Sequence, residues 1–244
     1  LILQSLGILF FMPNKMRIAK FIANAGYCSR REAEKLIENK LVKINNNLCL
    51  HPSDTVSEND KITIGKKIIR LNEIIKLWKL YKPIKYICSN KDQLNRKKIF
   101  DLIPDNFPRT ISIGRLDFMS EGLILLTNNG DYSRKLELPN QGYERIYRVC
   151  IRGKIEKKYL EKINKGIKID NIVYKKIKIK IDKSDKNFTW LIVKLKEGKN
   201  REIRNICKYF SWQIVKLIRI QYGPYKLGNL KVGEIEEIKI IKYA

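Results

Sequence analysis

The residues of this chain that are best suited to chemistry lie in a loop near its middle. Arg115 and Asp117 form a charged pair there, and Gly114 and Gly122 bracket the pair and permit tight turns. Apolar side chains flank the aspartate, so its carboxylate needs a nearby cation if it is to stay ionised. Such a carboxylate can act as a nucleophile or as a base. The same pattern is also typical of a structural ion pair, and these residues alone favour that interpretation.

The rest of the composition narrows the possible chemistry. One histidine, His51, occurs among 244 residues, which nearly excludes metal sites and catalytic triads based on histidine. The five cysteines are scattered and form no CxxC pair, which argues against a disulfide framework and against a structural zinc site. We therefore expect no metal, a cytoplasmic protein, and acid–base chemistry performed by carboxylates, tyrosines or lysines.

The charge of the chain predicts a polyanionic partner. Lysine and arginine number 51 against 25 aspartates and glutamates, which gives a formal net charge of +26. Nucleic acid and an anionic membrane surface both fit that charge, but the sequence lacks a long amphipathic helix. The apolar segment 1–12 is too short to span a bilayer and lacks the features of a signal peptide. We therefore expect a nucleic-acid partner and no membrane.

The elements that must position the central loop alternate between strands and helices. An apolar run directly after the loop, Leu123 to Thr127, predicts a buried strand. In a second strand, residues 144–149, isoleucine and valine alternate with tyrosine and arginine, so Tyr147 is most simply a structural aromatic. Further strands are expected over residues 77–81, 173–182 and 189–196, and helices over residues 99–104, 130–138, 155–165 and from about residue 200.

Residues 16–64 have the pattern of a small domain of their own. A first helix ends at Gly26, and Ser29 is a good N-cap for a second helix over residues 30–39. Glu32 stands at the third helical position, as in a capping box. Two short strands are expected after the helices, at residues 42–45 and 61–64.

The remaining segments define the domain boundaries. Residues 1–15 are an uncertain N-terminal extension, and we expect the functional protein to begin near Met16. Residues 65–76, rich in lysine and isoleucine, are predicted to be a linker. A larger domain is then expected over residues 77–244.

The central loop has a further pattern, because its residues 114–117, 120–123 and 125–128 are Gly-Arg-Leu-Asp, Ser-Glu-Gly-Leu and Leu-Leu-Thr-Asn. This pattern resembles the catalytic motif of RNA pseudouridine synthases. The group that modifies single uridines in ribosomal RNA, and that carries a small RNA-binding domain in front, is the most similar. The resemblance implies an α+β fold, with a catalytic domain built on a mainly antiparallel mixed sheet with flanking helices.

Three further motifs follow the order of the same family. Lys-Pro at residues 82–83 resembles its first motif, Asn-Arg-Glu-Ile-Arg at residues 200–204 its third, and Leu-Ile-Arg at residues 217–219 its closing one. The likeness is greatest to the branch that acts on large-subunit ribosomal RNA, and a small-subunit target remains the alternative. The sequence departs from the family at Lys85, where members usually carry glycine.

The resemblance assigns roles to residues of the larger domain. Asp117 matches the catalytic carboxylate, and Arg204 matches the arginine that pairs with it. Tyr147 matches the tyrosine that contacts the target base. The pocket for that base is then expected to be formed by Leu217, Arg115 and Ile203.

The first domain has its own motifs, which are Arg-Ile-Ala-Lys at residues 17–20, residues 25–33 and residues 42–45. They resemble the αL RNA-binding module, which occurs in a small-subunit ribosomal protein and in tyrosyl-tRNA synthetase. A helix N-terminus with two adjacent arginines is suited to bind phosphate. By this resemblance the RNA contacts of the module are Lys20, Ser29, Arg30, Arg31, Lys35 and Lys43. In the larger domain we expect RNA contacts from Lys82, Arg201 and Arg219.

Together the resemblances imply an enzyme that isomerises a specific uridine of ribosomal RNA to pseudouridine. No cofactor is required, because nothing is oxidised and no group arrives from outside. The expected substrate is a structured stem-loop with a flipped-out uridine, and the expected protein is a monomer. A non-catalytic ribosome assembly factor that kept the fold is the alternative.

Overall fold

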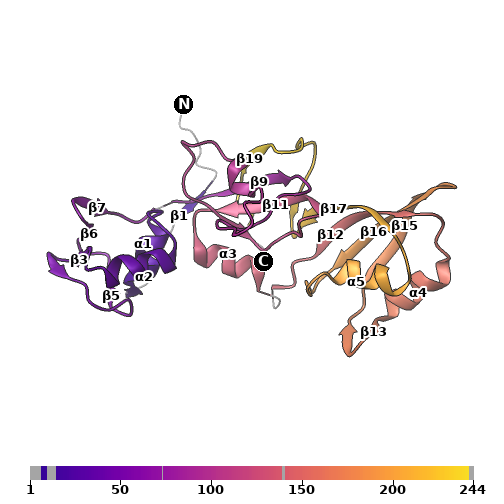
Figure 1. Ribbon diagram of the computed structural model, residues 1–244, viewed down its shortest axis with the longest axis horizontal. Helices are drawn as coiled ribbons and strands as arrows, with labels where there is room; N and C mark the ends of the chain where they lie inside the picture. Colours follow the sequence, from indigo (N-terminus) through magenta and orange to yellow (C-terminus); the bar gives the residue numbers. More distant parts are fainter. Residues whose placement is uncertain (1–6, 10–14, 73, 139–140, 242–244) are drawn as a thin grey trace.

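The computed structural model describes residues 7–9, 15–72, 74–138 and 141–241. The described chain is elongated and has three parts in a row (Figure 1). The N-terminal domain lies at one end, the strands β9, β11 and β19 with helix α3 lie in the middle, and the strands β12 and β15–β17 with helices α4 and α5 lie at the other end. The central loop, residues 114–120, lies between β10 and β11 in the middle part and faces α5 of the third part.

Two helices and a small sheet form the N-terminal domain. Helix α1 (Ile18–Asn24) and helix α2 (Arg30–Glu38) pack through Ile18, Ile22 and Ile37, which are at most 1% exposed. The predicted capping box is confirmed, because the Ser29 side chain accepts the Glu32 N–H while the Glu32 carboxylate accepts the Ser29 N–H. The four-stranded sheet has the order β4 (Asn47–Leu48), β3 (Val42–Ile44), β6 (Ile62–Ile64), β7 (Lys67–Ile69), and β2 (Met16–Arg17) pairs separately with β5 (Thr55–Val56).

The predicted linker, residues 65–76, contains two strands. Strand β7 pairs antiparallel with β6, and its Ile69 is 6% exposed in the core of the N-terminal domain. Strand β8 (Ile74–Ile75) pairs with β1 (Ile8–Leu9), which belongs to the predicted N-terminal extension. The composition of the segment, rich in lysine and isoleucine, did not predict these strands.

The rest of the described chain is organised on one nine-stranded sheet. Strand β11 (Glu121–Thr127) runs parallel to β17 (Ile214–Tyr222), and every other pair in the sheet is antiparallel, so the sheet is mixed and mainly antiparallel as expected. Its order is β15 (Lys178–Ser184), β16 (Phe188–Leu195), β12 (Arg145–Arg152), β17, β11, β9 (Leu77–Lys82), β19 (Ile235–Ile238), with β10 (Ile111–Ile113) on β11 and β18 (Tyr225–Lys226) on β17.

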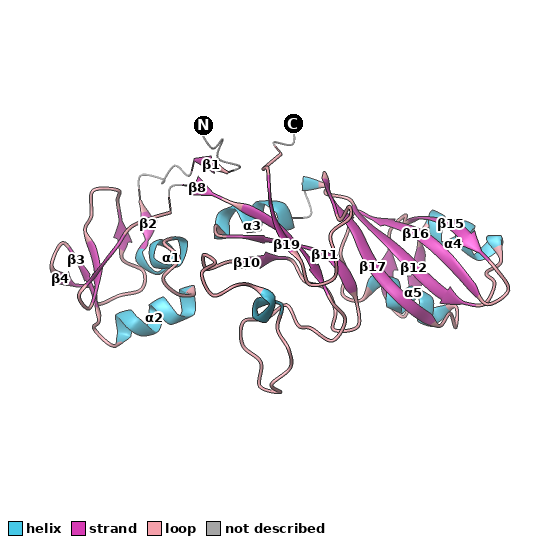
Figure 2. Ribbon diagram, turned by 90° about the horizontal axis from the view of Figure 1, so that it is seen from above, coloured by secondary structure: helices cyan, strands magenta, loops and turns pink. Residues whose placement is uncertain are grey.

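The helices and one hairpin complete the larger domain. Helix α3 (Gly130–Glu137) lies beside the middle strands, while α4 (Lys157–Lys165) and α5 (Glu202–Tyr209) cover one face of the far strands (Figure 2). A short 3-10 helix spans Ile99–Leu102. The strand expected over residues 173–182 is instead two elements, because β14 (Ile172–Tyr174) pairs with β13 (Ile167–Ile169) in a separate hairpin before β15 begins.

The parallel contact between β11 and β17 brings the central loop to the far part of the sheet. Gly122 pairs with Arg219, and a Cβ on Gly122 would lie 2.4 Å from the Arg219 carbonyl oxygen. Gly122 also has a φ of 102°, a conformation that other residues rarely adopt. Glycine is therefore required at this position if the two strands are to approach, and their approach places the loop at residues 114–120 beside α5.

Candidate active site

A buried lysine donates hydrogen bonds to the main chain of the central loop. Lys82, at the end of β9, is 0% exposed, and its ammonium group donates to the carbonyl oxygens of Ser120 at 2.7 Å, Pro83 at 2.9 Å and Asp117 at 3.0 Å. Burial lowers the pKa of Lys82 to about 8. Two of the three bonds fix the main chain at the aspartate and three residues after it, so Lys82 holds the loop in shape.

Two further contacts order the same loop. The Cys88 thiol donates to the Leu116 carbonyl oxygen at 3.5 Å, and the Leu116 N–H donates to the Cys88 sulfur at 3.4 Å. Ser120, which is 2% exposed, donates its N–H to the Asp117 carbonyl oxygen at 3.0 Å. Leu116 is buried beside the aspartate as expected, whereas Phe118 is 37% exposed.

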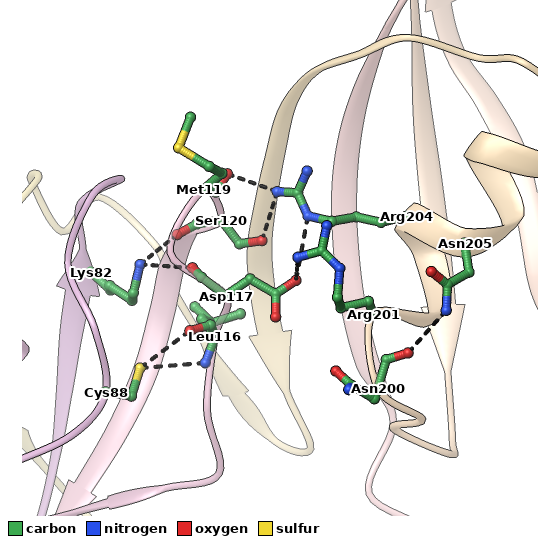
Figure 3. Close-up of polar contacts among 10 residues, drawn as sticks. All are labelled: Lys82, Cys88, Leu116, Asp117, Met119, Ser120, Asn200, Arg201, Arg204 and Asn205. Carbon is green, nitrogen blue, oxygen red and sulfur yellow. Dashed lines mark hydrogen bonds and ion pairs between the residues drawn. The ribbon is translucent and has the colours of Figure 1, made fainter. Parts of the chain in front are cut away.

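The Asp117 carboxylate faces two arginines of the α5 region (Figure 3). Its Oδ2 atom lies 3.3 Å from Arg204 Nε and 3.7 Å from Arg201 Nη1. The side chain of Arg204 is 17% exposed, and that of Arg201 is 53% exposed. Arg204 Nη2 also donates to the Met119 carbonyl oxygen at 2.8 Å and to Ser120 Oγ at 3.0 Å. The Arg204 guanidinium therefore contacts both the Asp117 carboxylate and the loop that carries it.

The turn before α5 explains why both arginines reach the carboxylate. Arg201 is the N-cap of α5 with a φ of 52°, and Arg204 lies three residues further along the helix, on the same face. Glu202 is 4% exposed, and its carboxylate accepts the Lys199 N–H at 3.1 Å, which closes the turn. Burial raises the pKa of Glu202 and lowers that of Arg204, and the nearby Asp117 carboxylate opposes the fall in the pKa of Arg204.

A pocket of about 820 Å³ opens in front of the carboxylate. Tyr147 of β12 and Arg219 of β17 are cross-strand partners, so their side chains leave the same face of the sheet. Leu217, two residues before Arg219, lies on that face too and is 5% exposed. The residues of the pocket wall that sequence analysis had named are Asp117, Arg115, Tyr147, Arg201, Ile203, Arg204, Leu217 and Arg219.

Several site predictions need correction. Asp117 pairs with Arg201 and Arg204, and among the described residues no ion pair joins it to Arg115, which is exposed on the pocket wall. Lys82 and Arg219 were expected to contact RNA, but they are 0% and 2% exposed. Arg219 donates from Nε to the Leu123 carbonyl oxygen at 2.7 Å. Lys82 therefore serves the inside of the fold, whereas Arg219 both binds the main chain and lines the wall of the catalytic pocket.

The predicted RNA contacts of the N-terminal domain divide into three sets. Lys20 lies 2.7 Å from Asp131 of α3, and Arg30 lies 4.0 Å from the same carboxylate, so both face the larger domain. Ser29 is occupied by the capping box. The other three side chains are exposed and have no ion-pair partner among the described residues: Arg31, Lys35 and Lys43.

In the part of the chain that the structure describes, no group of three or more His, Cys, Asp or Glu side chains is placed to hold a metal ion. No helix within the described residues is both long enough and apolar enough to cross a membrane.

Comparison with known proteins identifies the two domains. The model of the S4 domain matches residues 16–62, and the model of the RNA pseudouridylate synthase family matches residues 76–209, a range that contains Asp117, Tyr147 and Arg204. The chain belongs to the RNA pseudouridylate synthase family. The synthase is 46% identical to an RNA pseudouridine synthase of Rickettsia typhi, over 93% of each chain.

Two more relatives agree with this assignment. The synthase is 33% identical to ribosomal large subunit pseudouridine synthase B of Bacillus subtilis, over 91% of each chain. Its fold matches the crystal structure of a pseudouridylate synthase with a TM-score of 0.64 and 26% identity, over 92% of this chain and 96% of that one. The synthase is therefore an RNA-modifying isomerase with an S4 domain in front of its catalytic domain.

Proposed function

We propose that this synthase converts a uridine of large-subunit ribosomal RNA to pseudouridine, with Asp117 as the catalytic carboxylate. The observation that carries the proposal is the ion pair of Asp117 with Arg204, 3.3 Å apart, at the wall of a pocket of about 820 Å³. The choice of large-subunit RNA is supported by the likeness to the Bacillus subtilis enzyme, whose name states that target.

The reaction is an isomerisation, so its atoms balance without a cofactor. The N1–C1′ bond of uridine breaks, the uracil turns, and a C5–C1′ bond forms, while the proton on C5 leaves and N1 regains one. Asp117 acts at the ribose, either as a nucleophile at C1′ or as a base that removes a ribose proton. Arg204 and Arg201 hold its carboxylate in position during these steps.

The pocket supplies the surroundings that a detached uracil needs. Tyr147 offers an aromatic face on which the base stacks, and Leu217 forms an apolar floor. Ile203 adds a second apolar wall, because it is 7% exposed and lines the same pocket. Arg115, exposed at the pocket wall, is placed to contact the backbone of the flipped-out nucleotide.

The remaining parts of the proposal concern the RNA and the cell. Extrusion of the uridine from a structured stem-loop costs a few kcal/mol, which phosphate contacts from the exposed Arg31, Lys35 and Lys43 help to offset. We expect the enzyme to act as a monomer in the cytoplasm, where ribosomal RNA is made and where its five free cysteines stay reduced.

Release of tritium from ribosomal RNA labelled at uridine C5 tests the proposal. Large-subunit and small-subunit RNA are assayed separately with the wild-type chain and with Asp117→Asn, and RNA binding is measured in parallel. Release from large-subunit RNA alone, abolished in the variant, is the expected result. Release from small-subunit RNA alone overturns the choice of target. Binding without release from either RNA overturns the catalytic proposal and indicates an assembly factor.

A further inference from the structure

A second pocket lies beside the catalytic one, and its rim is rich in lysine. Its volume is about 810 Å³, within the usual range of about 300–1,000 Å³ for ligand sites. It lies between the β13–β14 hairpin and the segment that leads into α5. Leu195 and Glu202 line both pockets, so the two share a wall.

Of the five lysines that line this pocket, one has an acidic partner among the described residues. Lys175 pairs with Glu197 at 2.7 Å, and Glu202 is occupied by the Lys199 N–H. Among the described residues the other four lysines of the lining have no ion-pair partner, and all four are exposed: Lys165, Lys168, Lys176 and Lys196. Four unpaired cations around one concave surface create a positive potential that favours a polyanion.

The hairpin that carries part of this rim is tied to the catalytic arginines. Lys199, in the turn before α5, donates from its ammonium group to the Val173 carbonyl oxygen of β14. The same ammonium lies 5.7 Å from the centre of the Tyr174 ring. The turn that presents Arg201 to Asp117 is thus braced against one side of the second pocket, and residues of the segment 197–202 line both pockets.

We propose that the pocket between the β13–β14 hairpin and the α5 turn binds the phosphodiester backbone of the substrate RNA next to the target uridine. The inference rests on the proposed function, because it takes its ligand from the RNA that occupies the adjoining catalytic pocket. Charge complementarity and the shared wall identify the occupant as RNA backbone. The unpaired lysines contact phosphates and anchor the strand, while the chemistry stays at Asp117.

A charge-matched pair of triple variants tests the inference. The pocket variant is Lys168→Gln, Lys176→Gln, Lys196→Gln. The control variant is Lys178→Gln, Lys180→Gln, Lys183→Gln, which removes three exposed lysines of β15 that lie outside the lining of the second pocket. Both variants lose the same charge, so a general effect of charge changes them equally.

Binding of a ribosomal RNA fragment is measured over a series of salt concentrations, and tritium release gives KM and kcat. For the pocket variant we expect KM to rise about tenfold, kcat to stay within about twofold, and the salt slope of binding to fall by about 3. The control variant should change KM by less than about twofold. Equal losses in the two variants overturn the inference. If wild-type enzyme releases no tritium, the proposed function fails while the binding data still decide the inference.

Lysine footprinting of the wild-type chain gives an answer that needs no variant. Acetylation is followed by mass spectrometry without ligand, with the RNA fragment, and with inorganic phosphate. We expect RNA to protect Lys168, Lys176 and Lys196 at least fivefold more than Lys178 and Lys180, and phosphate to protect none of them. Equal protection by phosphate overturns the assignment to RNA backbone, and so does protection of the β15 lysines alone.

Discussion

The Asp117 loop and the N-terminal domain hold their basic residues in opposite ways. Beside the loop, Lys82 is 0% exposed, the side chain of Arg204 is 17% exposed, and each donates to main-chain carbonyl oxygens. In the N-terminal domain Arg31 and Lys35 are exposed and unpaired among the described residues. The electrostatic interactions of buried cations are little screened by salt, so such cations can position a reacting group. The attraction between exposed cations and RNA phosphates is screened by salt. Substitutions in the two regions should therefore differ in size and in the quantity that they change.

The largest effect is expected where a largely buried and an exposed arginine share one carboxylate. Arg204→Met should lower kcat/KM about 10²–10³-fold, because truncating one partner of a buried pair costs roughly 3–5 kcal/mol and the side chains of Arg204 and Asp117 are 17% and 32% exposed, which reduces that cost. Arg201→Met is the matched control and should cost about tenfold or less, because the side chain of Arg201 is 53% exposed. Single-turnover tritium release measures both. Equal losses would show that the two arginines act alike, against the distinction by burial.

The next effect concerns the stability of the loop. Lys82→Met leaves three carbonyl oxygens without their donor and should lower the free energy of unfolding by about 2–4 kcal/mol at pH 7. Lys79→Met on the same strand is the control, since its partner Glu236 is 54% exposed, and it should cost less than about 1 kcal/mol. Urea unfolding measures both. A cost for Lys82→Met as small as that of the control would contradict a buried anchor.

Lys82 also predicts a pH dependence. Its pKa falls from 10.5 to about 8 on folding, so between these values the unfolded chain holds a proton that the folded chain has lost. The stability of the wild type relative to Lys82→Met should therefore rise with pH across that window, by about 3 kcal/mol in total. Activity should fall above about pH 8, because a neutral amine has two N–H groups for three carbonyl oxygens. A wild-type kcat that is constant from pH 7 to 9.5 would contradict this.

A smaller effect, of another kind, is expected in the N-terminal domain. The triple variant Arg31→Gln, Lys35→Gln, Lys43→Gln should weaken RNA binding about tenfold and reduce its salt slope by about 3, with kcat within about twofold. Fluorescence anisotropy over a salt series measures the slope. Asp131→Asn is a companion variant that releases Lys20 and Arg30 from their ion pairs, and it should change binding by less than about threefold. A fall in kcat for the triple variant would contradict a role limited to binding.

The sequence predicted which residues belong to the candidate active site better than it predicted which residues contact one another there. The resemblance named Asp117 and Arg204, and the structure places them 3.3 Å apart. Proximity in the sequence suggested Arg115 as a partner, but the ion pair depends on the contact between β11 and β17, which only the folded sheet creates. Lys82 had the appearance of a surface lysine, because the carbonyl oxygens that it binds come from a loop distant in sequence.

The backbone conformation was not predicted at Lys85, the position where the resemblance implies glycine. The φ of Lys85 is 63°, in the left-handed region. Its N–H donates to the Phe118 carbonyl oxygen at 2.7 Å, so this turn also supports the Asp117 loop. A side chain at such a φ costs roughly 1–2 kcal/mol, and the structure keeps the turn at that cost.

The smallest expected effect follows from that strain. Lys85→Gly should relieve it, but glycine adds entropy to the unfolded chain, so the net gain in the free energy of unfolding is about 0.5–1 kcal/mol, or a few degrees in Tm. Asn46→Gly in the N-terminal domain is the control, because Asn46 has a φ of 72° and asparagine adopts that region at low cost. It should leave Tm within about one degree. Because the Lys85 N–H and its bond to Phe118 remain in the glycine variant, kcat should stay within about twofold. A loss of stability in Lys85→Gly would mean that the Lys85 side chain stabilises the turn by more than its backbone strain costs.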